Sequence, residues 1–386
     1  MISIRPLRGL RPPKDLVAQV AAPPYDVISS DEARIMAQGN PLSFLHVNKP
    51  EIDLPENTPL YSDQVYEKGR ENLQRFIAQG VLKHDAEEAI YIYRLTWRGH
   101  AQTGYLCLSS VDDYLQGRIK KHELTRADKE ADRTKLTDVQ NAQVGPVVLF
   151  YPSTPTLDEV LQQTAETTAE VDFTSADGVR NQLWVIADPE RIRHIQSNFG
   201  ELPATYVADG HHRSASACNV CLLRRKLHPT YTGQEPFNFF LSVIFPHHQL
   251  RILPYNRVVR DLNGLSEKEF LEAVGRIFSL SPLSGGFSAG HPHRFGMYSA
   301  GRWYALTAQP GSFQEQDPLD SLDVNILMKQ LLAPVLAIGD PRTDKRINFI
   351  GGIRGDEELV RLVDSGRYAV AFSLPPTTME QLMQVA

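Results

Sequence analysis

The sequence has little of several features that would place it at once in a functional class. Its 386 residues include only three cysteines, and a chain of this length can bury a core that needs no disulfide. The longest apolar runs, at 146–151 and 237–245, are far shorter than the roughly 20 residues that span a bilayer. The first residues lack the apolar core of a signal peptide. We therefore expect a cytoplasmic protein with no membrane partner.

The sequence also has no excess of basic over acidic residues. The sequence holds 40 lysines and arginines against 46 aspartates and glutamates, which gives a formal net charge of −6. A protein that binds nucleic acid usually carries a basic excess or a basic face. The dense basic runs at 118–122 and 224–226 are interpreted as solvated surface, and no helix-turn-helix pattern stands out. We expect no nucleic-acid partner.

The glycine-rich loops of dinucleotide and triphosphate sites, G-x-G-x-x-G and G-x-x-x-x-G-K-[ST], are missing. The expected order mixes hairpins, at 89–109 and 294–307, with strand–helix alternations, and includes strands at 42–47 and 250–253. This order predicts an α+β fold with mixed sheets, hairpins and packed helices rather than a doubly wound sheet.

The length fits two or three lobes. Proline and threonine at 152–156 mark the first boundary. We expect an N-terminal α+β lobe (1–152), a central lobe (153–310) and a C-terminal segment (311–386) that packs back on the core.

One stretch, at 205–215, organises the functional prediction. A short apolar strand at 205–208 runs into Asp209-Gly210, and a helix over 211–226 follows. Glycine permits the sharp turn, and Asp209 suits the N-cap of the helix. The free N–H groups and positive dipole end of a helix start favour an anion, most often a phosphate. The first turn carries His211, His212 and Arg213. The alternative is an exposed basic helix start.

The charged run at 117–133 is the second candidate. Its string Lys120-Lys121-His122-Glu123 places a carboxylate beside cations, where it can stay ionised and act as a general base. Lys121 or His122 would contact a phosphate or substrate. The alternative is a solvated helix with salt bridges.

Other polar positions are candidate substrate contacts. Two prolines lead into a rigid corner at Tyr25 and Asp26. Arg257, and the loop that carries Arg342 and Lys345, could contact an anionic ligand. The alternatives are plain turns and an exposed loop whose ion pairs contribute little.

Cys218 and Cys221 form a single C-x-x-C, and one such pair is a weak sign of zinc or redox chemistry. Both lie inside the expected helix over 211–226, so we predict buried core cysteines. The histidines at 247–248 and 291–293 have no metal spacing. No metal ligand is assigned from these patterns.

Asp209 to Arg213 resembles the D-G-H-H-R signature of archaeal free serine kinases, and Gly210-x-His212-Arg213 is similar to the nucleotide-phosphate loop of the ParB/sulfiredoxin superfamily. The whole chain resembles a widespread bacterial family known as domain of unknown function 1015. The strings that carry this second resemblance lie at 22–28, 119–123, 209–213, 253–257 and 340–346. Together the resemblances imply a ParB/sulfiredoxin-like phosphate-binding core.

The kinase resemblance implies a phosphotransferase that makes O-phosphoserine from serine and a donor such as ATP, ADP or pyrophosphate, with Mg²⁺. It implies catalytic roles for Glu123, Asp209 and His211. The phosphate-binding residues would be Gly210, His212, Arg213, Lys121 and His122. The candidate substrate contacts are Tyr25, Asp26, Arg257, Arg342 and Lys345.

Two alternatives stay open, a phosphoserine-type phosphatase and a non-catalytic nucleotide-sensing module. The sequence also leaves open the donor, the acceptor, the direction of transfer and the oligomeric state. It does not show whether Glu123 and Arg213 share one pocket.

Overall fold

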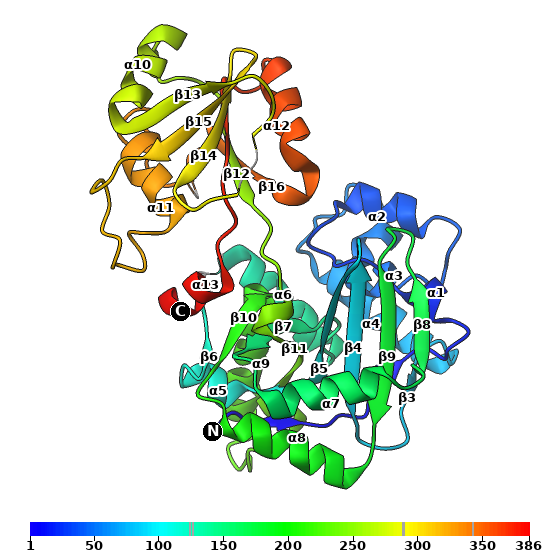
Figure 1. Ribbon diagram of the computed structural model, residues 1–386. Coiled ribbons are helices and arrows are strands. Elements are labelled where there is room, and N and C mark those ends of the chain that lie inside the picture. The colour runs from blue at the N-terminus through cyan, green and yellow to red at the C-terminus, as the bar shows by residue number, and fades with distance from the viewer. Residues whose placement is uncertain (123–124, 126, 288–289, 342) are drawn as a thin grey trace. The chain divides into compact units, whose positions relative to one another are not determined.

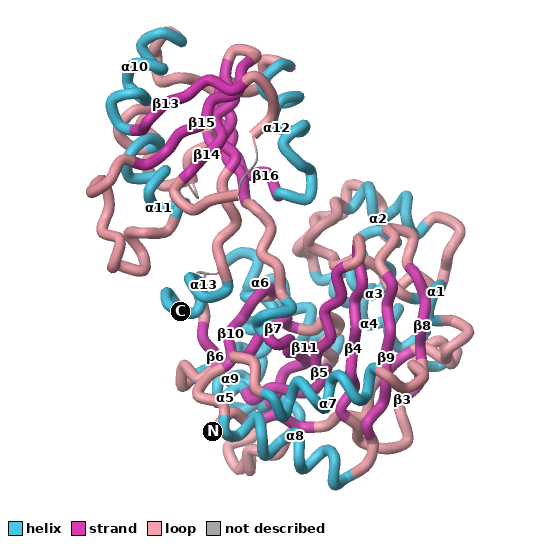
Figure 2. The backbone as a smooth tube through the Cα atoms, viewed as in Figure 1, coloured by secondary structure: helices cyan, strands magenta, loops and turns pink. Residues whose placement is uncertain are grey.

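The computed structural model describes residues 1–122, 125, 127–287, 290–341 and 343–386, and its secondary structure is mixed α+β, as predicted (Figures 1 and 2). The chain divides into two compact units, Met1–Leu250 and Arg251–Ala386. The predicted boundaries near 152 and 310 do not match this division. Strands before and after residue 152 share one sheet in the first unit. The proline and threonine that suggested a boundary instead begin a helix, with Thr154 as its N-cap and Pro155 at its first position.

In the described part of the chain, nine strands form the large sheet of the first unit, in the order β6-β10-β7-β11-β5-β4-β9-β8, with β1 paired to β5. The pairs β6/β10 and β7/β11 are parallel, and the other pairs are antiparallel. The strands are β1 (Ile4–Arg5), β4 (Ile90–Trp97), β5 (His100–Ser110), β6 (Ile119–Lys120), β7 (Val147–Tyr151), β8 (Val171–Thr174), β9 (Arg180–Ile186), β10 (Thr205–Asp209) and β11 (Phe239–Pro246). A separate pair joins β2 (Leu10–Arg11) to β3 (Lys83–His84).

Helices pack around this sheet, and Figure 1 shows α7 and α8 side by side. They are α1 (Val17–Val20), α2 (Ser30–Ala37), α3 (Leu45–Asn48), α4 (Asp63–Ala78), α5 (Val111–Leu115), α6 (Ala127–Gln140), α7 (Pro155–Ala165), α8 (Pro189–Glu201) and α9 (His211–Leu227). Short 3₁₀ turns lie at η1 (Pro50–Asp53), η2 (Pro236–Asn238) and η3 (His247–Gln249). Helix α6 packs along α9, and this contact positions the candidate site.

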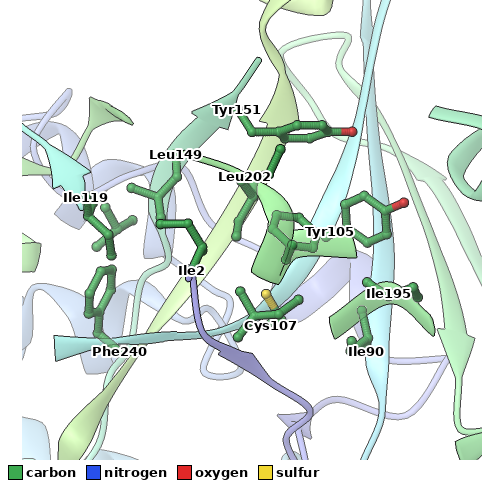
Figure 3. Packing of buried hydrophobic residues seen from close by; sticks show 14 of the residues in the cluster. Ile2, Ile90, Tyr105, Cys107, Ile119, Leu149, Tyr151, Ile195, Leu202 and Phe240 are labelled. Atoms are coloured by element: carbon green, nitrogen blue, oxygen red, sulfur yellow. The ribbon is translucent and has the colours of Figure 1, made fainter. Parts of the chain in front are cut away.

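The main core of the first unit lies between the sheet and its helices. Tyr105, Tyr151 and Phe199 are fully buried there and pack edge-on or tilted against one another. Ile119, the first residue of β6, is buried in the same core, as Figure 3 shows. Burying such a side chain contributes about 1.5–3 kcal/mol. The buried isoleucine therefore anchors β6, which lies within the charged run at 117–133.

Two strand predictions in the connecting regions are wrong. The run at 42–47 contains the start of α3, because its apolar Leu45 and Val47 are buried within a layer of helices. A short apolar run does not distinguish a strand from a buried helix. Residues 250–253 form no strand and lie where the first unit ends and the second begins. The hairpin at 89–109 is confirmed as β4 and β5, with Trp97 paired to His100.

The second unit contains an antiparallel sheet of six described strands, in the order β13-β15-β14-β17-β12-β16. The strands are β12 (Tyr255–Val259), β13 (Phe278–Leu283), β14 (Arg294–Ser299), β15 (Arg302–Ala308), β16 (Ile347–Gly351) and β17 (Val370–Ser373). The helices are α10 (Glu267–Ile277), α11 (Asp323–Leu327), the π-helical turn η4 (Met328–Leu332), the 3₁₀ turn η5 (Gly352–Arg354), α12 (Gly355–Asp364) and α13 (Met379–Val385). The predicted hairpin at 294–307 is confirmed. Among the helices of the described chain, none combines the length and the apolar character needed to cross a membrane.

Candidate functional site

The two charged strings of the sequence meet at one edge of the large sheet. Strands β6 and β10 pair in parallel, with Ile119 opposite Thr205 and Lys120 opposite Tyr206. The carboxyl ends of parallel neighbours lie at the same edge, so Lys121 and His122 follow β6 beside the turn that starts α9. This pairing joins segments that are about ninety positions apart in the chain.

The turn between β10 and α9 has the left-handed conformation that favours glycine. Gly210 is the N-cap of α9, with φ of 90° and no side-chain cap. The prediction that Asp209 caps the helix is therefore wrong, because its carboxylate accepts a hydrogen bond from the Arg213 guanidinium instead. A Cβ on Gly210 would lie 3.0 Å from Arg213 Nε. The glycine therefore supplies both the turn and the space that the guanidinium occupies.

Arg213 holds this turn together. Its Nη1 donates to the Pro146 carbonyl, and its Nη2 donates to Asp209. Asp26 lies 3.8 Å from the same Nη2. The buried Nε of Arg213 has no hydrogen-bond partner among the described residues. Arg213 thus links β7, the turn and the N-terminal corner, and much of its donor capacity is already committed to the protein.

Two histidines face each other where the strings meet. The rings of His122 and His211 pack edge to face, with centroids 4.6 Å apart and an interplanar angle of 89°. Burial, together with the neighbouring His122, His212 and Lys121, lowers the pKa of His211 to about 4. Burial also lowers the pKa of His122. Both rings are therefore neutral at pH 7 and can donate or accept hydrogen bonds, but they add no net charge.

Lys121 follows directly on β6 and supplies a cation at this edge. It is exposed, and its Nζ lies 4.3 Å from the centre of the Tyr114 ring. An ammonium over an aromatic face is held by a weak electrostatic attraction that a stronger anionic partner can replace. His212, on the first turn of α9, is partly buried.

A carboxylate that the sequence analysis did not single out lies in the same cluster. Glu130 of α6 accepts hydrogen bonds from Thr125 Oγ1 at 2.5 Å and from Asn219 Nδ2 at 2.7 Å. The bond from Thr125 lowers the pKa of Glu130, and the bond from Asn219 and the charges of His212 and Lys121 act in the same direction. Glu130 was hidden in the most charged run of the sequence, and only the packing of α6 on α9 distinguishes it from a solvated residue.

The N-terminal corner also reaches this region. The Arg133 guanidinium lies 4.3 Å from the centre of the Tyr25 ring, and its Nε donates to Asp132 at 2.8 Å. Burial raises the pKa of Tyr25, which stays a neutral phenol. Together with the approach of Asp26 to Arg213, this contact places the predicted corner beside the turn before α9.

The structure thus assembles most, but not all, of the predicted residues. The assembled residues are Tyr25, Asp26, Lys121, His122, Asp209, Gly210, His211, His212 and Arg213. Arg257 lies on β12 and Lys345 in the loop before β16, both in the second unit. Glu123 and Arg342 lie outside the described residues.

The cysteine prediction is confirmed. Cys218 and Cys221 are buried and reduced in α9, and burial raises the pKa of Cys221 to about 11. Such thiols pack as small apolar groups and react slowly, because little thiolate forms. In the described ranges, no group of three histidine, cysteine, aspartate or glutamate side chains is arranged so that it could hold a metal ion.

A family model described as "Protein of unknown function (DUF1015)" matches residues 4–325. No curated protein matches the sequence. One similar solved structure is a free serine kinase in complex with AMP, with 13% identity, coverage of 72% of this chain and 80% of that chain, and a TM-score of 0.33. A mutant free serine kinase in complex with ADP has 12% identity, the same coverage and a TM-score of 0.32.

Proposed function

This chain belongs to the DUF1015 family of proteins of unknown function, and we propose that it is a phosphotransferase with a free serine kinase-like activity. In this proposal it transfers a phosphoryl group from a nucleotide or pyrophosphate to the hydroxyl of serine. The supporting observation is the parallel pairing of β6 with β10, which places Lys121 and His122 beside the glycine turn and first helical turn of α9.

The start of α9 would hold the phosphates of the donor. Its first N–H groups have no partner within the helix and point towards an anion at its end. Lys121 would add charge and hydrogen bonds, and the rings of His122, His211 and His212 would contribute hydrogen bonds. Arg213 would act mainly by fixing the turn, because Pro146 and Asp209 already accept from it.

In the proposed step, the serine oxygen forms a bond to the terminal phosphorus while the bond from that phosphorus to the bridging oxygen breaks. The hydroxyl proton passes to the Glu123 carboxylate, and the shortened nucleotide or phosphate leaves with the bonding electrons. Most of the acceleration would come from positioning and charge neutralisation, as in phosphoryl transfer generally. Tyr25 and Asp26 would line the acceptor side.

The donor would bring Mg²⁺, which usually binds through phosphates, waters and one or two carboxylates. The site fits this mode, because the Asp209 side chain is 66% exposed beside the start of α9. Asp209 or Glu123 would contact the ion, and the ion would neutralise charge on the donor phosphates.

A direct test incubates the purified chain with serine, Mg²⁺ and each of ATP, ADP and pyrophosphate, and detects O-phosphoserine by ³¹P NMR. We expect product with at least one donor. Glu123→Gln should abolish turnover while pyrophosphate binding survives, and Glu201→Gln, at the exposed end of α8, is the matched control.

Three other outcomes would overturn the kinase proposal. Release of phosphate from phosphoserine without a donor would favour the phosphatase alternative. Donor binding without any product would favour the nucleotide-sensing module. No binding and no product would remove the phosphoryl interpretation altogether.

A further inference from the structure

An arginine and two aromatic rings form a cluster at the edge of the sheet in the second unit. Tyr255 and Arg257 are two positions apart on β12, and Phe349 of β16 lies opposite Arg257. The rings of Tyr255 and Phe349 stack with centroids 5.4 Å apart and an interplanar angle of 13°. The Arg257 guanidinium lies 4.5 Å from the Phe349 ring centre and 5.3 Å from the Tyr255 ring centre.

Arg257 has no anionic partner in the described part of the chain. Among the described residues, no carboxylate lies within ion-pair distance of its guanidinium, and its one hydrogen bond runs from Nη1 to the Tyr255 carbonyl. Burial lowers the pKa of Arg257 to about 10, so the side chain is still a cation at pH 7. A partly buried charge without a partner is costly, and proteins usually pair such groups.

Another arginine of the same unit shows the usual arrangement. Arg346 contacts Asp344 at 3.0 Å and Asp261 at 3.4 Å, and it donates to the carbonyls of Leu336 and Ala337. Its role is to close the loop before β16. Within the described ranges, one carbonyl accepts a hydrogen bond from the Arg257 guanidinium, and its other N–H groups are available to a ligand.

The rings beside Arg257 leave a planar surface open. Tyr255 is 56% exposed. Phe349 is partly exposed and stacked beneath the tyrosine. A stacked pair with an open face suits another flat ring, and a guanidinium at its margin suits an anionic group.

We propose that Tyr255, Arg257 and Phe349 form a binding site for a small organic anion that carries a planar ring. The guanidinium edge binds the anionic group, and the ring of the ligand stacks on Tyr255. The anion could be a phosphate, as in a nucleoside monophosphate, or a carboxylate, as in an aromatic acid. The site lies wholly in the second unit and does not depend on the proposed kinase activity.

The test titrates the full chain by isothermal titration calorimetry with AMP, benzoate, adenosine and inorganic phosphate. We expect a binding event with AMP or benzoate that weakens about tenfold or more in Arg257→Ala, because a charge-assisted hydrogen bond is lost. Tyr255→Ala, at an exposed ring, should weaken the ring-bearing ligands and leave inorganic phosphate unchanged. The control is Arg294→Ala, which removes a cation from β14 of the same sheet, 6.0 Å from the Phe287 ring centre. This variant should leave the affinity for each ligand unchanged.

The outcomes separate this inference from the kinase proposal. If Arg257→Ala and Tyr255→Ala both bind AMP and benzoate as the wild type does, the inference is wrong even where Lys121→Ala abolishes phosphate binding in the first unit. If Lys121→Ala has no effect while Arg257→Ala removes a binding event, this inference stands and the phosphate site at α9 does not. Equal loss in Arg294→Ala would mean that the variants disturb the sheet, and would also contradict the inference.

Discussion

Gly210 offers the sharpest structural perturbation of the candidate site. Gly210→Ala forces an L-residue into the left-handed region, which costs about 1–2 kcal/mol. The new Cβ would also lie 3.0 Å from Arg213 Nε, so the guanidinium must move from its bonds to Pro146 and Asp209. Losing one charge-assisted hydrogen bond adds about 1.5–3 kcal/mol.

Gly178→Ala is the matched control. Gly178 has φ of 81° in a turn of the same unit, and a Cβ there would meet nothing within 4 Å. Gly178→Ala should be destabilised only by the backbone strain, which costs about 1–2 kcal/mol. Each kcal/mol lowers the melting temperature by roughly 2–4 °C in a domain of this size.

Differential scanning fluorimetry would measure both variants with and without pyrophosphate. We expect the larger loss of melting temperature in Gly210→Ala, and we expect only this variant to lose the stabilisation that pyrophosphate gives to the folded state. Equal destabilisation of the two variants, with pyrophosphate still stabilising Gly210→Ala, would refute the reasoning that Arg213 and the glycine turn shape an anion site.

Three further predictions concern His211, Arg213 and two buried cysteines. The pKa of His211 is about 4 in the folded state and 6.5 in the unfolded state, so between these pH values the unfolded state binds one more proton. The free energy of unfolding should therefore fall by up to about 3 kcal/mol as the pH drops from above 6.5 to 4, and urea titrations should show a smaller fall in His211→Gln. Arg213→Lys keeps the charge but lacks the planar guanidinium that donates to both Pro146 and Asp209, so calorimetry should show pyrophosphate binding weakened nearly as much as in Arg213→Ala. Wild-type affinity in Arg213→Lys would contradict the linking role of the guanidinium. Burial raises the pKa of Cys107 to about 12 and that of Cys221 to about 11, so iodoacetamide at pH 8 should label neither thiol until the protein unfolds. Labelling of either thiol in the folded protein, detected by mass spectrometry, would contradict this prediction.

Local features of the site were readable from sequence because they depend on local chemistry. A glycine between an apolar strand and a helix indicates a turn, and Gly210 forms that turn in the left-handed conformation. The buried cysteines of α9 followed from their apolar neighbours. The capping box of Ser266 and Glu269 is likewise a local signal, and it is present at the start of α10.

Features that depend on distant partners were not readable. Strand β6 has only two residues, too few for any periodicity, so its parallel pairing with β10 could not be foreseen. The Asp209 carboxylate was expected to cap α9, but a guanidinium one helical turn away competes for it successfully. Glu130 became a candidate only through Thr125 and Asn219, which reach it from a loop and another helix.

The proposed phosphoryl transfer requires that the start of α9 binds phosphate. Calorimetric titration of the full chain with pyrophosphate, in the wild type, Lys121→Ala and Lys226→Ala, tests it in one experiment. Lys226 is exposed in the last turn of the same helix, so its loss removes the same charge far from the site. We expect Lys121→Ala to weaken pyrophosphate binding about tenfold and Lys226→Ala to leave it unchanged. Equal affinity in all three proteins, or no binding to the wild type, would contradict it.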